Sequence, residues 1–188
     1  IGEMCFSPLG DKLLAVTMTG IIDVFEFDRC SGQLSNWIPL GIPAPVDTGA
    51  NTYYGCSFSP DGTKIYVSEG GNGITGGDRL FQFDLTAIDI PASKTLLFTE
   101  VDSVAIGQHQ LGPDGKIYIT QIHWRYWDTS NVNHRHLSVI NDPNQPGLAC
   151  NYVHQQLYLE GRYSTLNPPH PPTFNLPPLV AQNAEAGP

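Results

Sequence analysis

The fold is decided by the stretch Ser57-Phe58-Ser59-Pro60-Asp61-Gly62-Thr63-Lys64-Ile65-Tyr66-Val67-Ser68, because the chain contains two further segments that are related to it. One related copy spans residues 5–16 and another spans residues 110–120, and the prolines of successive copies lie 52 and 53 residues apart. Pro-Asp-Gly combines a fixed φ, a side chain that bonds the backbone and a residue that tolerates positive φ, so it predicts a tight hairpin turn. The β-branched, aromatic and aliphatic residues after the turn predict a strand.

A second element recurs in phase with the first. Residues 22–28 (IDVFEFD) match residues 79–84 (RLFQFD) and, more weakly, residues 136–141 (HLSVIN). Their last residues, Asp28, Asp84 and Asn141, lie 56 and 57 residues apart. The alternation of apolar and polar positions predicts a half-buried strand, with Phe81 and Phe83 on one side. A polar residue at the strand end predicts a turn role, since its side chain accepts backbone N–H bonds.

Each repeat therefore contains strand, turn, strand, loop and strand, and a fourth strand is expected at residues 34–40, 95–99 and 152–159. Four strands in about 50 residues are typical of a propeller blade. We predict an all-β chain, a β-propeller with four-stranded blades at about 1–51, 52–103 and 104–166. A β-sandwich is the alternative, but sandwiches lack a fixed period. Propellers close with about 4 to 8 blades, so we expect missing blades before residue 1 or a second chain that completes the ring.

Residues 167–188 form a separate, proline-rich segment that includes Pro168, Pro169, Pro171, Pro172, Pro177 and Pro178. Proline lacks the N–H that a sheet ladder needs, so this segment is not expected to form a central strand. We predict an extended tail, partly polyproline II, that lies on the propeller or on a neighbour.

The composition excludes several classes of function. The chain has 188 residues, with 18 acidic against 9 basic side chains and a net charge of −9. This acidic balance disfavours binding to duplex nucleic acid and to anionic membrane surfaces, since both need clustered Lys and Arg. No apolar run approaches the roughly 18 residues of a membrane-spanning helix, so no membrane insertion is expected. The 19 glycines and 16 prolines leave little room for long helices.

Four stretches, at residues 27–35, 54–62, 110–118 and 137–152, resemble one known family. It is the group of WD40-like propeller repeats in large secreted and surface proteins of the Bacteroidota. These proteins often carry a type IX secretion sorting domain and belong to the gliding-motility-associated group. The resemblance implies the propeller fold and an extracellular location, either secreted or at the cell surface. The chain departs from the family pattern in having no sorting domain and only a degraded match at residues 174–179.

The most unusual loop is predicted after the second strand of the last blade, and it contains His123, Trp124, Arg125, Tyr126 and Trp127. Such loops lie on one face of a propeller, where ligands or partners bind. Trp, Tyr and Arg dominate binding hot spots, and aromatic faces suit sugar rings. This loop is our candidate binding site for a protein partner, for identical chains or for a glycan. The alternative is a loop whose aromatic rings pack on its own blade.

Two segments contain residue types that could bind a metal ion. His134 and His136 would share one face of a strand, and His109 or His123 could supply a third ligand. Residues 69–78 combine five glycines with two acids and could bind calcium through oxygen ligands, but the segment contains no known calcium-binding motif and a flexible turn is the favoured interpretation. Neither pattern is specific, so no cofactor is predicted. The chain also lacks a Gly-x-Ser-x-Gly elbow, and no catalytic residue is assigned.

The four cysteines have no Cys-x-x-Cys spacing, which excludes zinc ribbons and thioredoxin-type motifs. Secretion, which the family resemblance implies, would favour oxidation. Cys30 and Cys56 flank one blade junction, so we predict a disulfide between them. Cys5 would then have its partner outside this sequence. Buried free thiols are the alternative.

The sequence thus favours a non-catalytic, secreted or cell-surface propeller scaffold for adhesion or protein assembly. One alternative is a propeller enzyme, similar to a lactonase or lyase, with an active site on the propeller axis. Such a site would need several carboxylates, histidines or a metal around the axis. A second alternative is a structural subunit of an extracellular polymer, joined to identical chains through open blade edges.

Overall fold

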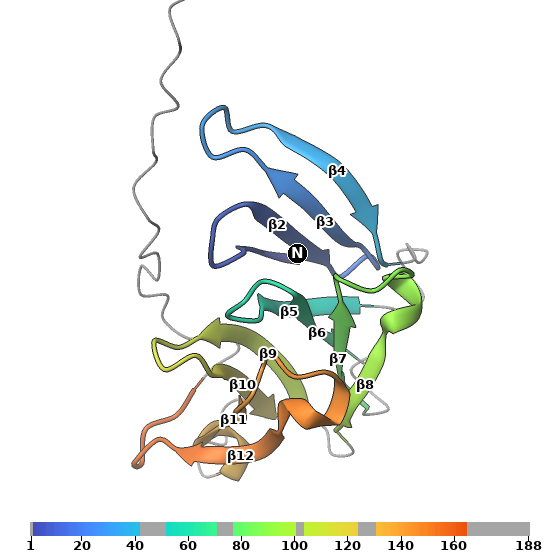
Figure 1. Cartoon of the computed structure of the whole chain (residues 1–188). Helices are drawn as coiled ribbons and strands as arrows, with labels where there is room; N and C mark the ends of the chain where they lie inside the picture. Colours follow the sequence, from blue (N-terminus) through green and yellow to red (C-terminus); the bar gives the residue numbers. More distant parts are fainter. Residues whose placement is uncertain (1, 42–51, 71–76, 101–103, 124–130, 165–188) are drawn as a thin grey trace, which may run out of the picture.

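The structure is a computed structural model that describes residues 2–41, 52–70, 77–100, 104–123 and 131–164 (Figure 1). Within these ranges the chain forms three four-stranded antiparallel sheets and three short 3-10 helices. Each sheet is formed by four strands that follow one another in the sequence. The predicted all-β fold with four-stranded blades is confirmed.

The three sheets are named blades 1 to 3 in chain order. Blade 1 comprises β1 (Gly2–Phe6), β2 (Lys12–Thr17), β3 (Ile22–Phe27) and β4 (Leu34–Pro39). Blade 2 comprises β5 (Thr52–Phe58), β6 (Lys64–Gly70), β7 (Arg79–Asp84) and β8 (Thr95–Thr99), with η1 (Pro91–Ser93) before β8. Blade 3 comprises β9 (Val104–Leu111), β10 (Ile117–His123), η2 (Val132–His134), β11 (His136–Ile140), η3 (Gly147–Cys150) and β12 (Tyr152–Tyr158).

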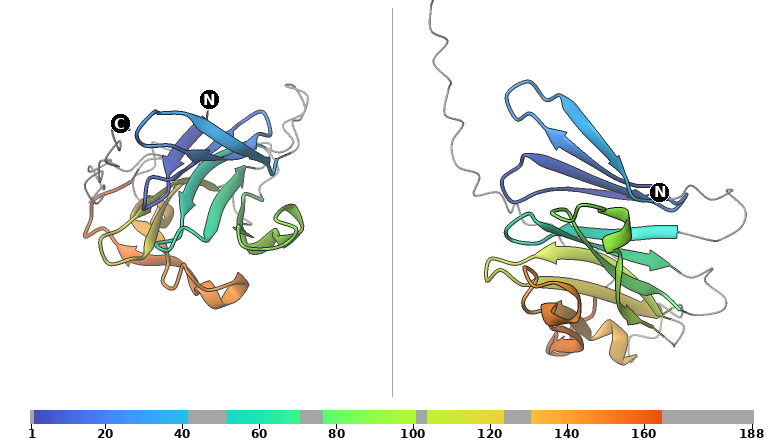
Figure 2. Two further views of the ribbon diagram at one scale, coloured as in Figure 1. Left: turned by 45° about the horizontal axis from the view of Figure 1, so that its top comes forward. Right: turned by 45° about the vertical axis from the view of Figure 1, so that its right-hand side comes forward.

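The blades pack face to face in chain order, and blade 2 lies between blades 1 and 3 (Figure 2). The first strand of each blade lies next to the first strand of the following blade, which is the arrangement around a propeller axis. Glycines permit this approach at one point. A Cβ atom at Gly55 on β5 would overlap the carbonyl oxygen of Gly107 on β9.

The predicted hairpin turns are confirmed in all three blades. Gly10, Gly62 and Gly115 adopt positive φ values of 67°, 70° and 77°. Each of these glycines donates its N–H to the carbonyl oxygen three residues earlier, over 2.8 to 3.1 Å. The first strand of each blade therefore ends two residues before the proline, and the chain reverses into the next strand with the same geometry.

The pairing of strands gives every blade one equivalent cross-strand row. Phe6 faces Leu13, and Leu13 faces Phe25 in blade 1. The same register brings together Phe58, Ile65 and Phe83 in blade 2, and Leu111, Ile117 and Ile140 in blade 3. By register, Glu26 is therefore the counterpart of Asp84, so the match of Asp28 to Asp84 in the sequence is displaced by two residues.

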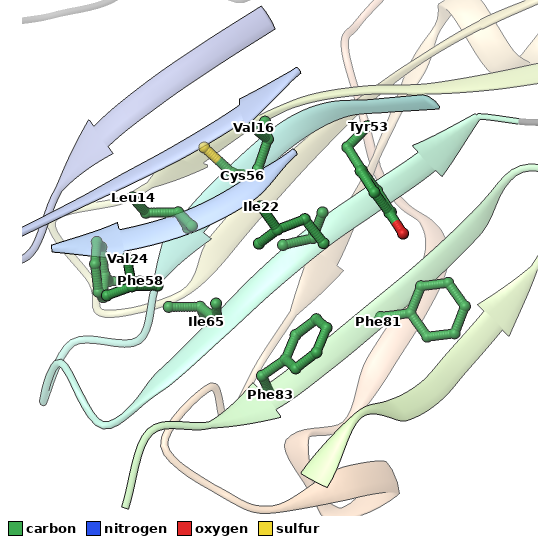
Figure 3. Packing of buried hydrophobic residues seen from close by; sticks show 11 residues of the cluster. Leu14, Val16, Ile22, Val24, Tyr53, Cys56, Phe58, Ile65, Phe81 and Phe83 are labelled. Atoms are coloured by element: carbon green, nitrogen blue, oxygen red, sulfur yellow. The ribbon is translucent and has the colours of Figure 1, made fainter. Parts of the chain in front are cut away.

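Two apolar cores lie between the blades. Leu14, Val16, Ile22 and Val24 of blade 1 pack on the apolar residues of blade 2 that Figure 3 shows. A second core joins blade 2 to blade 3 and includes Tyr66, Leu80, Ile106, Ile117, Ile119, Ile140 and Cys150. Because blade 2 is covered on both faces, the prediction of a half-buried strand at residues 79–84 is wrong. Phe81 and Phe83 point to one core, and Leu80 is buried in the other.

The connection between β11 and β12 fastens blade 3 to blade 2. The Gln82 side chain donates to the Gln145 carbonyl over 2.9 Å and accepts the Gly147 N–H over 2.7 Å. The Tyr66 hydroxyl donates to the Pro143 carbonyl over 2.7 Å and accepts a bond from Gln82. Residues 137–152, one of the four stretches on which the family resemblance rests, thus contain an interblade contact.

None of the helices that the structure describes is both long and apolar enough to cross a membrane. The proline-rich segment 167–188 lies outside the described residues, so its predicted extended conformation stays a prediction.

Candidate functional site

Blade 1 has one face that no described sheet covers. Side chains alternate between the two faces of a strand. Leu14 and Val16 point to blade 2 and are at most 1% exposed, so Leu13 points to the opposite side. The same alternation on β3 buries Val24 and directs Phe25 away from blade 2. Figure 2 shows this side of blade 1 at the edge of the stack.

Apolar side chains gather on this uncovered side, which we call the open face of blade 1. Phe6 and Phe27 contact each other there, with ring centroids 4.9 Å apart. Met4 is 67% exposed, and Trp37, which precedes the inward-packed Ile38, is 62% exposed. The open face consists of Met4, Phe6, Leu13, Phe25, Phe27 and Trp37.

The open face corresponds to a buried interface in the other blades. Phe58, Ile65 and Phe83, the counterparts of Phe6, Leu13 and Phe25, are at most 3% exposed because blade 1 covers them. In blade 3 the counterparts of Leu13 and Phe25 are Ile117 and Ile140, which are fully buried against blade 2. The same row of side chains therefore makes an interblade contact wherever a preceding blade is present.

Polar groups between the innermost strands serve the packing of the blades. The His109 ring on β9 lies between two hydroxyls of blade 2, with Nε2 2.6 Å from Ser68 Oγ and Nδ1 3.2 Å from Ser57 Oγ. Burial lowers the pKa of His109 to about 3, so the ring is neutral at physiological pH. His109 is 5% exposed and Ser68 is fully buried. This group joins blades 2 and 3 and is closed to a substrate.

A second polar contact joins blades 1 and 2. The carboxylate of Glu3 accepts the backbone N–H of Cys56 over 3.2 Å. Burial raises the pKa of Glu3 to about 7, although the bond from Cys56 acts in the opposite direction. Because Glu3 is buried between blades 1 and 2, its carboxyl gains and loses its proton close to neutral pH.

The predicted aromatic site is only partly described. His123 is the last residue of β10, and its N–H donates to His134 Nε2 over 2.9 Å. Trp124, Arg125, Tyr126 and Trp127 lie outside the described residues. Their role as a binding loop stays a prediction.

The two histidines of the weak metal site do not share a strand. His134 belongs to η2 and is 1% exposed, whereas His136 begins β11. The Nε2 of His134 accepts the His123 N–H, and Nδ1 of His136 lies 2.9 Å from the Val132 carbonyl. The assumption of two rings on one strand face was wrong, because a 3-10 turn precedes the strand.

Possible cation ligands are also dispersed elsewhere in the described ranges. No group of three or more His, Cys, Asp or Glu side chains there could hold a metal ion. In the segment weighed for calcium, Glu69 forms ion pairs with Arg79 and Lys94, and Asp78 accepts the N–H of Ile106. Residues 71–76 of that segment lie outside the description.

The cysteines have an arrangement other than the predicted one. All four are free thiols, and the expected bond between Cys30 and Cys56 is not formed. Cys30 lies in the exposed turn after β3, where its N–H donates to Asp28 Oδ1 over 2.8 Å. Cys56 lies on the innermost strand of blade 2 and is buried in the core between blades 1 and 2, which the exposed Cys30 does not join. The neighbour of Cys56 is Cys5, with 3.6 Å between the Sγ atoms.

The polar residues at the ends of the third strands have the predicted turn role in two blades. Asp28 Oδ1 accepts the N–H groups of Cys30 and Ser31, and Asp84 Oδ1 accepts the N–H and hydroxyl of Thr86. These bonds hold the pKa of both carboxyls below the ordinary value. Asn141 instead bonds the Asn151 carbonyl and the Gln156 side chain on β12.

A shallow hollow lies where blades 2 and 3 meet, beside the connection between β11 and β12. Its lining residues are Pro60, Gly115, Asn141, Asp142, Pro143, Asn144 and Gln145. Asp142 is the one ionisable side chain among these lining residues. Acid–base chemistry usually requires a pair of groups with separated pKa values, which this hollow does not provide.

No protein-family model matches the chain, and no curated protein matches it. Among solved structures, the chain is similar to a protein of Bacteroides uniformis provisionally assigned as a 6-phosphogluconolactonase. The identity is 18%, the match covers 85% of this chain and 40% of that one, and the TM-score is 0.48.

Two further solved structures are similar at a lower level. The periplasmic gluconolactonase of Pseudomonas aeruginosa is 16% identical over 73% of this chain and 36% of its own, with a TM-score of 0.41. The Cps50 (Swd1) β-propeller domain of Myceliophteria thermophila is 13% identical over 80% of this chain and 39% of its own, with a TM-score of 0.40. This chain therefore spans less than half the length of each of the three structures. Similarity at this level does not extend to activity.

Proposed function

We propose that this chain is a non-catalytic propeller scaffold whose open face binds a further four-stranded blade within an extracellular assembly. The observation that carries the proposal is the cross-strand pair Leu13 and Phe25. The equivalent pairs of blades 2 and 3 contact a preceding blade, whereas no sheet among the described residues covers this pair. Exposed apolar patches on proteins commonly mark sites of association.

The chemistry of the partner follows from the interface that blade 1 already makes. Its other face presents the aliphatic side chains of Leu14, Val16 and Val24 to the aromatic row of blade 2. The open face repeats the aromatic side of that contact with Phe25, the counterpart of Phe83. The partner blade is therefore expected to present an aliphatic face of Leu, Val and Ile, with no charge at its centre.

The partner blade can come from one of two polypeptides. It belongs either to a longer polypeptide that contains these residues or to a separate chain, which includes an identical copy. The extracellular location rests on the resemblance to secreted Bacteroidota propellers. The loop that contains Trp124 and Trp127 is retained as a second contact for a protein or a glycan.

The arrangement of polar groups supports a non-catalytic role. His109 is bonded at both ring nitrogens and is closed to solvent. Glu69 is 3% exposed and is paired with Arg79 and Lys94. Both groups are used by the fold, and a catalytic site would need ionisable groups that reach a substrate.

An association assay on the full chain tests the proposal. The double variant Leu13→Lys and Phe25→Lys places two charges on the open face, and Leu148→Lys changes a side chain that is 74% exposed on blade 3. We expect the double variant to lose association with its partner blade, by at least about tenfold in Kd. Leu148→Lys should bind as the unchanged chain does, and circular dichroism should report the same strand content for all three proteins.

The enzyme alternative makes the opposite forecast. Unchanged association of the double variant, together with a stoichiometric metal or hydrolysis of a sugar lactone by the native protein, would overturn the scaffold proposal. Association and lactone hydrolysis are measured on the same preparations whose strand content has been checked by circular dichroism. A loss of folding can then not be mistaken for a loss of binding.

A further inference from the structure

The innermost strands of blades 1 and 2 bring two thiols into contact. Cys5 on β1 and Cys56 on β5 are 51 residues apart in the sequence, and their Sγ atoms lie 3.6 Å apart. Cys56 is 1% exposed within the core between the two blades, and the partly buried Cys5 packs against the same core. Figure 3 shows the sulfur of Cys56 at the boundary between the two sheets, near Val16.

We propose that Cys5 and Cys56 are a disulfide site, which links blade 1 to blade 2 covalently when a low-molecular-weight disulfide oxidises the chain. A disulfide has its sulfur atoms about 2.05 Å apart, so the two atoms must approach by about 1.5 Å. Rotation of the less buried Cys5 side chain provides this movement without a change of strand register. The two sulfurs already face each other across a packed interface.

The other two cysteines lie elsewhere. Cys30 is in the exposed turn after β3, and Cys150 is fully buried in the core between blades 2 and 3. Cys5 is therefore the cysteine that lies next to Cys56 in the folded chain. Its bond would close a chain segment that contains all of blade 1 after β1.

The reaction is two successive thiol–disulfide exchanges. The thiolate of Cys5 attacks one sulfur of the small disulfide, forms a mixed disulfide and releases one small thiolate. The thiolate of Cys56 then attacks Cys5 Sγ and releases the second small thiolate. The two protons of the protein thiols pass to the two released thiolates. The protein loses two electrons, and the small disulfide is reduced to two thiols.

The order of the two steps follows from the surroundings of each thiol. The contact with Cys5 is the largest cause that raises the pKa of Cys56, followed by burial. Conversion of Cys5 to a mixed disulfide removes the Cys5 thiol, and with it the largest of these causes. Cys56 is then easier to deprotonate at the step that needs its thiolate.

The test uses the full chain with Cys30→Ser, which removes the exposed thiol and leaves the core unchanged. The folded protein is equilibrated with oxidised glutathione, unfolded and alkylated, and its intact mass and linked peptides are measured. We expect a mass lower by two hydrogens, one alkylated thiol at Cys150, and a cross-linked peptide pair that contains Cys5 and Cys56. The oxidised chain should melt roughly 5–10 °C above the reduced chain.

Two variants give the matched comparison. Cys150→Ser in the same background should keep the linked peptides, and Cys5→Ser should remove both the link and the rise in melting temperature. Three alkylated thiols after oxidation, glutathione retained on Cys5 or Cys56 without a link, or a bond to Cys150 would each overturn the proposal. Because the linked peptides are mapped in a chain with both residues intact, a folding defect of a variant does not affect the main result.

Discussion

Leu13 of blade 1 and Ile65 of blade 2 occupy the same position of the repeat, but among the described sheets one packs on Ile65 from the preceding blade and none covers Leu13 in that way. Leu13 pairs with Phe25 across β2 and β3, as Ile65 pairs with Phe83 across β6 and β7. Ile65 is fully buried, whereas Leu13 is partly exposed. Comparison of the two side chains therefore distinguishes the contribution of strand pairing to stability from the contribution of blade packing.

Truncation of these two side chains should have unequal effects on stability. Ile65→Ala is expected to lower the free energy of unfolding by about 2–5 kcal/mol, because it leaves a cavity in a closed core. Leu13→Ala should cost about 1 kcal/mol or less, because its site is open to solvent. Urea denaturation of the isolated chain measures both. Equal losses would mean that the open face is covered in the isolated chain.

The close approach of β5 and β9 predicts a strong effect at Gly55. A Cβ atom there would overlap the Gly107 carbonyl oxygen, so Gly55→Ala should lower the free energy of unfolding by about 1–3 kcal/mol or more. At Gly70 a Cβ would instead meet the Thr52 side chain, which makes Gly70→Ala the milder control. Thermal melts followed by circular dichroism would show the difference. An unchanged melting temperature for Gly55→Ala would disprove the contact between the two backbones.

The buried ring of His109 predicts a loss of stability in acid. Its pKa is about 3 in the folded chain, against an ordinary value of 6.5. Between these values the unfolded chain binds a proton that the folded chain does not, so the free energy of unfolding falls as pH falls from about 6.5 towards 3. His109→Gln should reduce that slope, measured by urea denaturation at several pH values. A slope equal to that of the unchanged chain would contradict the burial of a neutral ring.

Burial of Glu3 predicts the opposite dependence of stability on pH, in a range that overlaps that of His109. Its pKa is raised to about 7 from an ordinary value of 4.5, so the folded chain keeps a proton that the unfolded chain releases. The contribution of Glu3 is greatest below pH 4.5 and is lost as pH rises through 7. Glu3→Gln should therefore be more stable than the unchanged chain at pH 8, and the gain should disappear at pH 4.5. A gain that is independent of pH would exclude this carboxyl as the cause.

The bonds of Gln82 predict a local effect at the boundary of blades 2 and 3. Gln82→Ala leaves the Gly147 N–H without its acceptor and removes the bond to the Gln145 carbonyl. Hydrogen exchange should then quicken at the backbone N–H groups of Asn144, Gln145 and Gly147, with little change in β1 to β4. Gln110→Ala, which removes a single bond to the Leu111 carbonyl, is the control. Slow exchange at Gly147 in the Gln82 variant would show that other contacts hold this connection.

Local chemistry explains which parts of the fold the sequence could predict. The limits of β7 and β8 agree with the predicted residues 79–84 and 95–99, because alternation and turn residues act over a few positions. The burial of β7 on both faces could not be predicted in this way. It depends on which blades flank blade 2, and that information lies some 50 residues away in the chain.

The candidate site was less predictable for the same reason. Cys5 and Cys56 hold nearby but unequal positions in their repeats, so comparison of the copies does not reveal that the two thiols meet across a blade boundary. The sequence offers His109 as a possible metal ligand. In the structure both of its ring nitrogens bond hydroxyls of the preceding blade, those of Ser57 and Ser68, and the sequence around His109 does not show these partners. A useful signal was present in Phe6, Leu13 and Phe25, whose counterparts in the later copies are all apolar. That no described sheet covers this part of blade 1 becomes visible only in the three-dimensional arrangement of the blades.

Photo-cross-linking from position 13 tests the central claim most directly. Leu13 is replaced by p-benzoylphenylalanine in the protein as its native host produces it, and the products are identified by peptide mapping. We predict one dominant product, formed with a strand of a four-stranded blade that lies outside residues 2–164 of the same chain, either in a longer polypeptide or in a second chain such as an identical copy. Replacement at position 148, on blade 3, should not give this product. Products confined to residues 2–164 within one chain, or no product beyond that of the control, would contradict the claim that the open face of blade 1 binds a further blade.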